Sequence, residues 1–396
     1  SRHLAASLGR LDEWLDRFPG LVIFRRPGGG PLAEGDLLVN PGLAAALERI
    51  AEEGSAGFYA GETARLIEEE MRRGGGLVTT ADLEGYRAIV RAPVAGSYRG
   101  VRLLSAPPPS AGGIAIVEAL NILEGFDLAS AGFLSDRAVH LLVEAEKRVF
   151  ADRARHLGDP DRWPVPVDSL VSGAYAARLR AGIGESATPA GEISAAVFPP
   201  GESPETTHYS ILDGDGNAVA VTTTLNSSYG SKVVVEGCGF LLNNEMDDFS
   251  VKPGAPNLYG LTGGEANAIA PGKRMLSSMS PTMLLDDDRV LAVLGTPGGS
   301  TIITTVLQLV VGIVDFGMTA AEAVAAPRFH HQWLPDVIQY ERGAFPPDLI
   351  AALERRGHRL VERTHTIGDA QIIVRDDRGA RGAPDPRGGG TAASVD

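Results

Sequence analysis

The sequence predicts a layered α/β fold on the basis of three observations. The chain has 396 residues and is 44% hydrophobic, so it can bury a sizeable core. Segments with strand patterning alternate with long segments of helical spacing. No internal similarity recurs at a period of about 20 to 50 residues, which argues against solenoids and propellers.

The first part of the chain, to about residue 183, is expected to be mainly helical. Helical spacing with proline starts, glycine stops or charged ends predicts helices near residues 41–54, 60–76, 112–126 and 136–158. Residues 91–113 instead have the pattern of short strands followed by a proline–glycine turn. Residues 184–205, "GESATPAGEISAAVFPPGESPE", have no sustained period, so we expect an exposed, mobile linker there.

The second part opens with a strong hairpin signal. Residues 207–226, "THYSILDGDGNAVAVTTTLN", are two strand-like runs around a "DGDGN" turn. This turn lacks the spacing and the distal glutamate of a calcium loop. Further strands are expected at 232–244, 281–295 and 370–379. A buried helix is expected over 302–314 and an amphipathic helix near 346–358.

Composition excludes some classes of protein. The net charge of −14 argues against a general nucleic-acid binder. The single cysteine, Cys238, cannot form an intrachain disulfide and is expected to be a small buried hydrophobe rather than a reactive thiol. The chain starts at Ser1 without the apolar core of a signal peptide, as a processed or truncated sequence does. The longest apolar run, 302–314, is too short to cross a membrane, and no anchor is visible.

Thr206 is a candidate nucleophile because it follows the linker and opens a strand. If the chain were cleaved after Glu205, the hydroxyl of Thr206 could attack an acyl carbon and its own α-amine could take the proton. Strands often begin with threonine, so this residue alone is a weak signal. Thr224 and Asn226, at the far end of the hairpin, could be brought back beside Thr206.

Three further clusters carry the groups that such chemistry needs. "LLNNEMDDFS" gathers carboxylates and amides suited to an ammonium group. "KRMLSSMSP" supplies Ser277 and Ser278, whose hydroxyls suit a carboxylate. "GTPGGSTIITT" places Gly298 and Gly299 before an apolar helix, where adjacent N–H groups can form an oxyanion hole. The alternative for "PGGS" is a tight turn or a phosphate cradle, but the lysine of a nucleotide loop is absent.

Five long segments in order resemble the small subunit of the γ-glutamyltransferases (γ-glutamyltranspeptidases), which are N-terminal nucleophile hydrolases. They are "TTHYSILDGDGNAVAVTTTLNSSYG", "GFLLNNEMDDFS", "PNLYGLTGGEANAIAPGKRMLSSMSPT", "GTPGGSTIITTVLQ" and "PRFHHQWLPD". Upstream, "GGLVTTADLEGYRA", "YRGVRLLSAPPPSAGG" and "ADRARHLGDP" resemble the later part of the large subunit. The resemblance therefore covers nearly the whole chain.

The resemblance implies a four-layer αββα sandwich of the N-terminal nucleophile hydrolase type. It assigns residues 1–205, including the linker at about 184–205, to the large-subunit region and 206–396 to the small, catalytic subunit. Both regions would form one domain. Two subunits from one precursor are therefore expected, with cleavage between Glu205 and Thr206.

The resemblance also implies roles for individual residues. Thr206 would be the nucleophile, Thr224 would help to activate it, and Gly298 and Gly299 would donate to the oxyanion. The binding residues would hold the γ-glutamyl group: its α-amino group by Asn226, Glu245 and Asp248, its α-carboxylate by Ser277 and Ser278, with Tyr259 on a covering lid loop.

The implied reaction is acyl transfer from glutathione or a similar γ-glutamyl donor to water, an amino acid or a dipeptide. It requires no metal or organic cofactor. Family members of the bacterial type are usually exported, which implies a periplasmic or extracellular location.

Two departures from the family pattern leave alternatives open: the upstream part of the family's large subunit is absent from this sequence, and the sequence is continuous across Glu205 and Thr206. The family has an upstream arginine for the substrate α-carboxylate, and Arg25 and Arg26 are interpreted as loop charges rather than its counterpart. A glutaryl-type cephalosporin acylase is one alternative, although an ammonium-binding cluster argues against it. A catalytically inactive, truncated homologue is the other.

His330 and His331 are adjacent, so on a strand they would point to opposite faces, and we expect a structural role rather than a metal site.

Overall fold

The computed structural model describes residues 1–193, 206–376 and 379–394. The chain divides into two compact units: unit 1 comprises 1–90 and 227–244, and unit 2 comprises 91–226 and 245–396. These boundaries differ from the expected subunit division at 205/206. That division concerns a covalent cleavage, and it stays a prediction.

Unit 1 is mainly helical. Its helices are α1 (Arg2–Gly9), η1 (Arg10–Trp14), η2 (Pro19–Phe24), α2 (Pro41–Glu53), α3 (Ala56–Tyr59), α4 (Gly61–Gly74) and α5 (Thr80–Gly85). The ends of α2 and α4 follow the sequence signals: Pro41 begins α2, and Gly75 ends α4 in the left-handed conformation at φ 73°.

One strand prediction in unit 1 is wrong. Residues 232–244 were expected to form a strand, but they form only an isolated bridge between Val234 and Leu241. Gly237 and Gly239 both have positive φ, so the chain turns back on itself there. Cys238 lies buried in this turn, as expected for a structural cysteine, and burial raises the pKa of its thiol.

Unit 2 is built on a six-stranded antiparallel sheet in the order β1-β2-β5-β6-β10-β11. The strands of this sheet are β1 (Val94–Tyr98), β2 (Val101–Ser105), β5 (Thr282–Asp286), β6 (Arg289–Gly295), β10 (Gln371–Asp376) and β11 (Gly379–Pro384). A small sheet of β7 (Phe329–His330), β8 (Ile338–Tyr340) and β9 (Leu360–Glu362) stands beside it.

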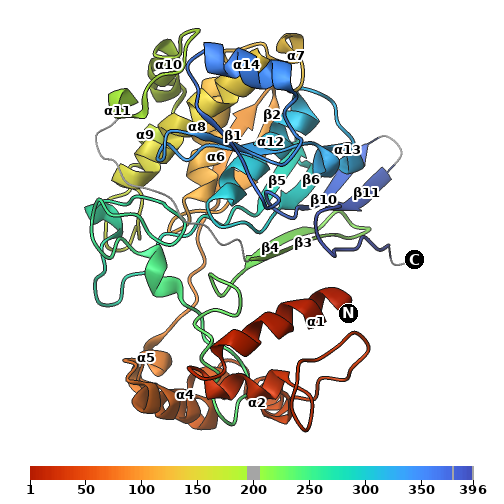
Figure 1. The fold of residues 1–396 in the computed structure, drawn as a ribbon. Helices are drawn as coiled ribbons and strands as arrows, with labels where there is room; N and C mark the ends of the chain where they lie inside the picture. Colours follow the sequence, from red (N-terminus) through yellow and green to blue (C-terminus); the bar gives the residue numbers. More distant parts are fainter. Residues whose placement is uncertain (194–205, 377–378, 395–396) are drawn as a thin grey trace. The chain divides into compact units, whose positions relative to one another are not determined.

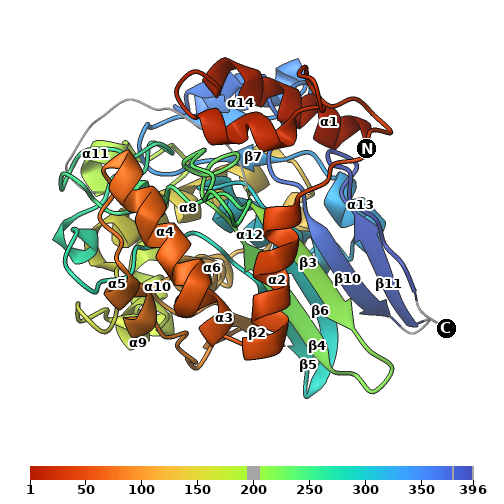
Figure 2. The same cartoon turned by 90° about the horizontal axis from the view of Figure 1, so that it is seen from below.

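The predicted hairpin is confirmed as β3 (Thr207–Leu212) and β4 (Ala218–Thr223). It packs against β6 and β10, on the face of the large sheet opposite to the helices (Figure 1; Figure 2). The imidazole of His208 lies on Gly295, where an added Cβ would come within 2.3 Å of the ring. A glycine in β6 thus allows the two sheets to approach closely.

Helices cover the other face of the large sheet and complete the core. The helices α6 (Gly112–Leu123) and α12 (Thr301–Val314) pack on the sheet, and α8 (Asp136–His156) packs on α6; all three bury most of their residues (Figure 1). The remaining helices of unit 2 are α7 (Leu128–Ala131), α9 (Val167–Leu170), α10 (Gly173–Ala181), α11 (Ala190–Ile193), η3 (Glu245–Asp248), η4 (Glu265–Asn267), α13 (Ala320–Ala325) and α14 (Pro347–Arg355). Unit 2 is therefore an α–β–β stack, with the two sheets packed on each other as the αββα expectation requires.

The first part of the expected linker, residues 184–193, is ordered rather than mobile. Thr188 accepts a hydrogen bond from Lys147 at its carbonyl and donates its N–H to Glu144, while Ala190 N–H donates to Asp336 Oδ2 at 2.8 Å. Residues 184–193 are thus attached to unit 2, because buried charged groups supply hydrogen bonds that composition does not reveal. The rest of the expected linker, 194–205, lies outside the described residues.

Candidate active site

The hairpin brings the two predicted threonines together. Thr207 pairs with Thr223 in the ladder, so Thr206 and Thr224 lie just beyond the last pair. Thr206 Oγ1 donates to Thr224 Oγ1 at 3.3 Å, and the Asn226 N–H donates to Thr224 Oγ1 at 2.8 Å. Two hydroxyls in hydrogen-bond contact at the start of a strand can share or relay a proton.

His208 is close to Thr206 in sequence, but its side chain makes hydrogen bonds within the β3–β4 hairpin. Its ring nitrogens bond to the hydroxyls of Thr222 and Ser210, at 2.9 and 3.1 Å. Burial lowers the pKa of His208 to about 4, so the ring is neutral at pH 7. The histidine therefore packs between the sheets, and its nitrogens are occupied by β3 and β4.

Gly298 and Gly299 connect β6 to α12 in conformations that favour glycine, with φ of 139° and 57°. The carbonyl of Gly298 accepts from Thr301 through both its N–H and its hydroxyl, so the turn is fixed on the first residue of α12. The ring of Tyr259 lies on Gly299, where an added Cβ would come within 2.5 Å of Tyr259 Cε1. Tyr259 also donates its hydroxyl to the Asn226 carbonyl at 2.8 Å.

The acidic cluster forms the short helix η3. Burial raises the pKa of Glu245 to about 7. Burial also raises the pKa of Asp248 to about 7, with Glu245 and Asp247 adding to the shift and Arg153 opposing it. Asn267 donates to the Asp248 carbonyl at 2.7 Å, which fixes the end of this helix. Two partly desolvated carboxylates of this kind can bind a cation strongly.

Ser277 and Ser278 lie on an extended segment that runs beside residues 109–111. Ser277 N–H donates to Pro109 O, and Ser277 O accepts from Ala111 N–H, both at 2.9 Å. Ser277 Oγ bonds to Ser110 Oγ at 3.2 Å. Sequence patterns did not single out Ser110, because the two segments are far apart in the chain.

Most of the predicted site residues line one cavity of about 340 Å³ in unit 2. Its lining includes the threonines Thr206 and Thr224, the oxyanion candidate Gly299, and the binding candidates Asn226, Asp248, Tyr259, Ser277 and Ser278. Glu245 and Gly298 do not line it but adjoin residues that do. A second cavity elsewhere in unit 2 has a mainly apolar lining, so it offers less to acyl-transfer chemistry.

The cavity also contains Arg153, a residue that the sequence analysis missed. Arg153 belongs to α8 and is buried, and its Nη2 donates to Ser278 Oγ at 3.4 Å. Arg25 and Arg26 instead pair with Asp12 and Asp36 within unit 1, in agreement with their interpretation as loop charges.

Two groups of histidines contain side chains that can bind metal ions in proteins. His330 bonds to Thr304 and Gln332, and His331 bonds to Asp336 and to the Trp333 N–H, so the ring nitrogens of both are occupied. His140, Glu144 and His358 also lie close together.

This second group is better explained as structural. Glu144 already accepts from Lys147, Arg148 and Thr188. The His140 and His358 rings bond to each other at 2.8 Å. Burial lowers the pKa of both imidazoles, and the nearby Lys147 contributes in the same direction. A charge-balanced, hydrogen-bonded core is a poor environment for an added cation.

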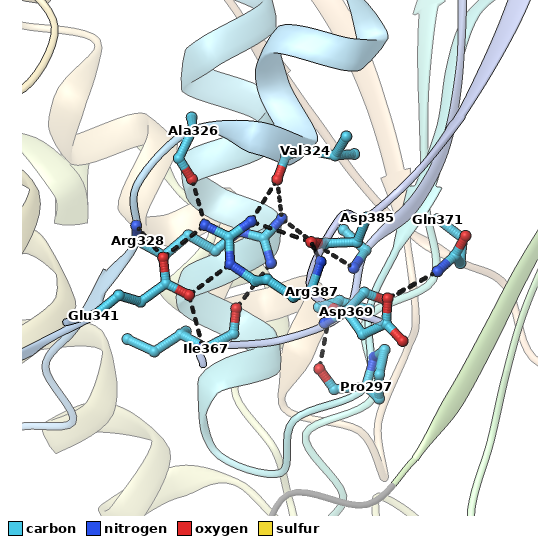
Figure 3. Close-up of polar contacts among 12 residues, drawn as sticks. Pro297, Val324, Ala326, Arg328, Glu341, Ile367, Asp369, Gln371, Asp385 and Arg387 are labelled. Carbon is cyan, nitrogen blue, oxygen red and sulfur yellow. Dashed lines mark hydrogen bonds and ion pairs between the residues drawn. The ribbon is translucent and has the colours of Figure 1, made fainter. Parts of the chain in front are cut away.

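A buried ion cluster holds the backbone of residues 367–370 (Figure 3). Asp385 pairs with Arg328 at 2.6 Å and with Arg387 at 3.1 Å, and Arg387 also pairs with Glu341 at 2.5 Å. Arg328 and Glu341 bond to the backbone of Ile367, while Asp385 accepts from Ala370 N–H.

The segment of residues 367–370 also contacts Thr296, in the loop that precedes Gly298. Asp369 N–H donates to Thr296 Oγ1 at 2.9 Å, and Thr296 Oγ1 donates to the Pro297 carbonyl at 2.7 Å. Residues 385–387, "DPR", therefore form a salt-bridged turn, and the contacts of this turn lead to the loop before the glycine pair.

The two stacked sheets fit the N-terminal nucleophile hydrolase class, and a solved structure supports this assignment. The cephalosporin acylase from Bacillus halodurans superposes with a TM-score of 0.81 at 30% identity, covering 99% of this chain and 70% of that one. Residues 1–395 match the family model described as gamma-glutamyltranspeptidase. The chain therefore belongs to the γ-glutamyltranspeptidase family, a family of enzymes.

Curated relatives agree with this assignment. The glutathione hydrolase proenzyme of Escherichia coli (strain K12) is 51% identical, covering 91% of this chain and 62% of the relative. That of Pseudomonas sp. (strain A14) is 48% identical with the same coverage. The acylase ACY 1 proenzyme of Pseudomonas sp. (strain SE83) is 40% identical, covering 96% and 66%. The chain thus spans 62% of the length of the first two relatives.

None of the helices within residues 1–193, 206–376 and 379–394 combines the length and the apolar character that a membrane crossing needs.

Proposed function

We propose that this protein is an autoprocessing γ-glutamyl hydrolase and acyltransferase that uses Thr206 as its nucleophile. The observation that carries the proposal is the joint lining of one cavity by Thr206, Thr224, Gly299 and the half-buried Asp248. A nucleophile, an oxyanion site and an anionic subsite are the parts that γ-glutamyl transfer requires.

Autocleavage begins when Thr206 Oγ1 attacks the Glu205 carbonyl. The peptide bond becomes an ester, and water hydrolyses the ester to leave a carboxylate at Glu205 and an α-amine at Thr206. The chain then consists of two subunits from one precursor. The Thr224 hydroxyl, 3.3 Å from Thr206 Oγ1, orients the attacking oxygen in this step and in turnover.

In turnover the neutral α-amine of Thr206 accepts the proton of its own hydroxyl. Oγ1 bonds to the γ-carbonyl carbon of the donor, and the N–H groups of Gly298 and Gly299 stabilise the resulting oxyanion. The proton passes to the departing amine as the amide bond breaks. A γ-glutamyl ester remains on Thr206, and water, an amino acid or a dipeptide removes it.

The proposed substrate is glutathione or a related γ-glutamyl compound. Glu245 and Asp248, with Asn226, receive the α-ammonium group, and Ser277 and Ser278 receive the α-carboxylate. Relatives named glutathione hydrolase proenzyme support this choice, and so do the two partly desolvated carboxylates. The proposed location is the periplasm or the outside of the cell.

The first test is the intact mass of the purified protein after incubation, compared with Thr206→Ala and Thr207→Ala. Thr207 is the exposed neighbour in β3 and serves as the matched control. We expect two fragments from the wild type and from Thr207→Ala, with the smaller beginning at Thr206, and a single chain from Thr206→Ala. A single uncleaved chain in all three would favour the inactive-homologue alternative.

The second test separates γ-glutamyl from glutaryl specificity, since an acylase is also among the relatives. γ-Glutamyl-p-nitroanilide and glutaryl-p-nitroanilide differ only in the α-amino group. We expect the γ-glutamyl compound to have a kcat/KM about tenfold or more higher, because a charge-assisted contact to a buried carboxylate contributes roughly 1.5–3 kcal/mol. A preference for the glutaryl compound would assign the cleaved enzyme to the acylase alternative.

A further inference from the structure

Arg153 is a buried cation in the wall of the site cavity. It lies in the last turn of α8 and is only 5% exposed. Its Nη2 makes a long hydrogen bond of 3.4 Å to Ser278 Oγ, and its Nε has no hydrogen-bond partner among the described residues. A buried guanidinium is costly unless opposite charge surrounds it, so packing alone does not explain its position.

Asp248 supplies that opposite charge. Both residues line the same cavity. Burial lowers the pKa of Arg153 to about 10, and the charge of Asp248 acts against this shift. The groups that face Asp248 are Glu245 and Asp247, which raise its pKa, and Arg153, which lowers it. Arg153 is thus the cation whose charge offsets the effect of Glu245 and Asp247 on the pKa of Asp248.

We propose, on the basis of the γ-glutamyl function above, that Arg153 is a positioning residue that acts through Asp248 and Ser278. Its charge increases the ionised fraction of Asp248, the form that receives the substrate ammonium. Its Nη2 holds the Ser278 hydroxyl at the end of the cavity that receives the substrate carboxylate. One guanidinium thereby sets both ends of a subsite for a zwitterionic head group.

The proposal requires that removal of the Arg153 charge raises KM more than it lowers kcat. Without Arg153, Asp248 faces Glu245 and Asp247 and takes up a proton at a higher pH. Loss of a nearby opposite charge typically shifts a carboxyl pKa by about 1 to 3 units. If the shift is about one unit from 7, the ionised fraction at pH 7 falls from about a half to about a tenth. KM at pH 7 should then rise about fivefold and recover near pH 9.

The experiment measures kcat and KM for γ-glutamyl-p-nitroanilide from pH 5 to 9 on protein whose cleavage has been confirmed by mass. The variants are Arg153→Gln, which removes the charge, and Arg153→Lys, which keeps a cation. Arg137→Gln is the matched control, because Arg137 is an exposed arginine in the first turn of the same helix. If Arg153→Gln does not fold, Arg153→Met replaces it, since it retains part of the aliphatic stem.

For Arg153→Gln we expect the acidic limb of the kcat/KM profile to move up by about one pH unit, with kcat nearly unchanged. Arg153→Lys should keep the limb at the wild-type position while raising KM through the altered Ser278 contact, and Arg137→Gln should match the wild type. An unmoved limb in a folded, cleaved Arg153→Gln would overturn the proposal. So would a fall in kcat alone, because that result indicates a structural role.

Failure of the underlying function has a different signature. A cleaved wild type that does not hydrolyse the γ-glutamyl probe would refute the proposed function, and the role of Arg153 with it. An active wild type with unchanged Arg153 variants would refute only the role of Arg153. Loss of autocleavage in a folded Arg153→Gln would also refute that role, because it would place Arg153 in the chemistry of Thr206.

Discussion

Replacing Asp385 with asparagine tests how much the buried ion cluster of Arg328, Glu341, Asp385 and Arg387 contributes to stability (Figure 3). The Asp385 carboxylate accepts from Arg328 Nη2 at 2.6 Å, Arg387 Nη1 at 3.1 Å and the Ala370 N–H at 2.8 Å. Its side chain is fully buried, and those of Arg328 and Arg387 are 2% and 11% exposed. With Glu341, the cluster has two cations and two anions and is neutral.

The substitution leaves one buried positive charge without a partner and turns an amide N–H₂ toward hydrogen-bond donors. Removing one member of a buried ion pair typically costs about 3–5 kcal/mol, because the remaining charge stays desolvated. We therefore expect Asp385→Asn to lower the free energy of unfolding by about that amount. Because the cluster holds Ile367 and Ala370, the loss should be visible in the global unfolding transition.

The assay is guanidinium chloride unfolding followed by tryptophan fluorescence. Asp288→Asn is the matched control, because Asp288 pairs with Arg102 at 3.4 Å but is 98% exposed. We expect no measurable change in that control. The charge-balanced double variant Arg328→Met with Asp385→Leu should be more stable than Asp385→Asn alone. A loss below about 1 kcal/mol in Asp385→Asn would refute the reasoning, because it would mean that the cluster is hydrated or readily rearranged.

Two further predictions concern the cavity. Because the pKa values of Glu245 and Asp248 are raised to about 7, both carboxyl groups take up protons as pH falls through 7, and KM for a γ-glutamyl donor should rise from pH 8 to pH 5. Ordinary carboxyl groups would leave KM unchanged down to about pH 5, so a flat profile would contradict the burial argument. Gly299→Ala places a Cβ within 2.5 Å of Tyr259 at a φ of 57°, and should lower kcat about 100-fold or more. Gly317→Ala, at φ 63° with open space around it, imposes a similar backbone penalty and should leave kcat unchanged; equal losses in both variants would show that the contact with Tyr259 is unimportant.

Much of the fold could be predicted because the signals are local. The "DGDGN" turn and the alternation on either side placed β3 and β4, and the apolar run at 302–314 placed α12. The prediction failed at 232–244, where β-branched residues favoured a strand but Gly237 and Gly239 turn the chain. Glycines allow a turn without requiring one, so only the rest of the fold decides between the two outcomes.

The candidate site residues also divide into those visible in the sequence and those that are not. Thr206, the glycine pair, the acidic cluster and the serine pair belong to continuous motifs, so the sequence singled them out as candidates together with the family. Arg153 was missed because "ADRARHLG" looks like any charged helix end. It reaches Ser278, 125 residues further along the chain, only because α8 crosses the end of the serine segment.

By itself, the sequence therefore determined the hairpin, the main helices, the family and the motifs that bear chemistry, since each depends on residues that are neighbours in the chain. Only the tertiary structure decided that Ser110 lies against Ser277, that Arg153 opposes Asp248, and that the Asp385 cluster holds the backbone of residues 367–370. The physical reason is that burial and long-range contact set the charge and position of a side chain. Both arise only when segments that are distant in the chain pack against each other.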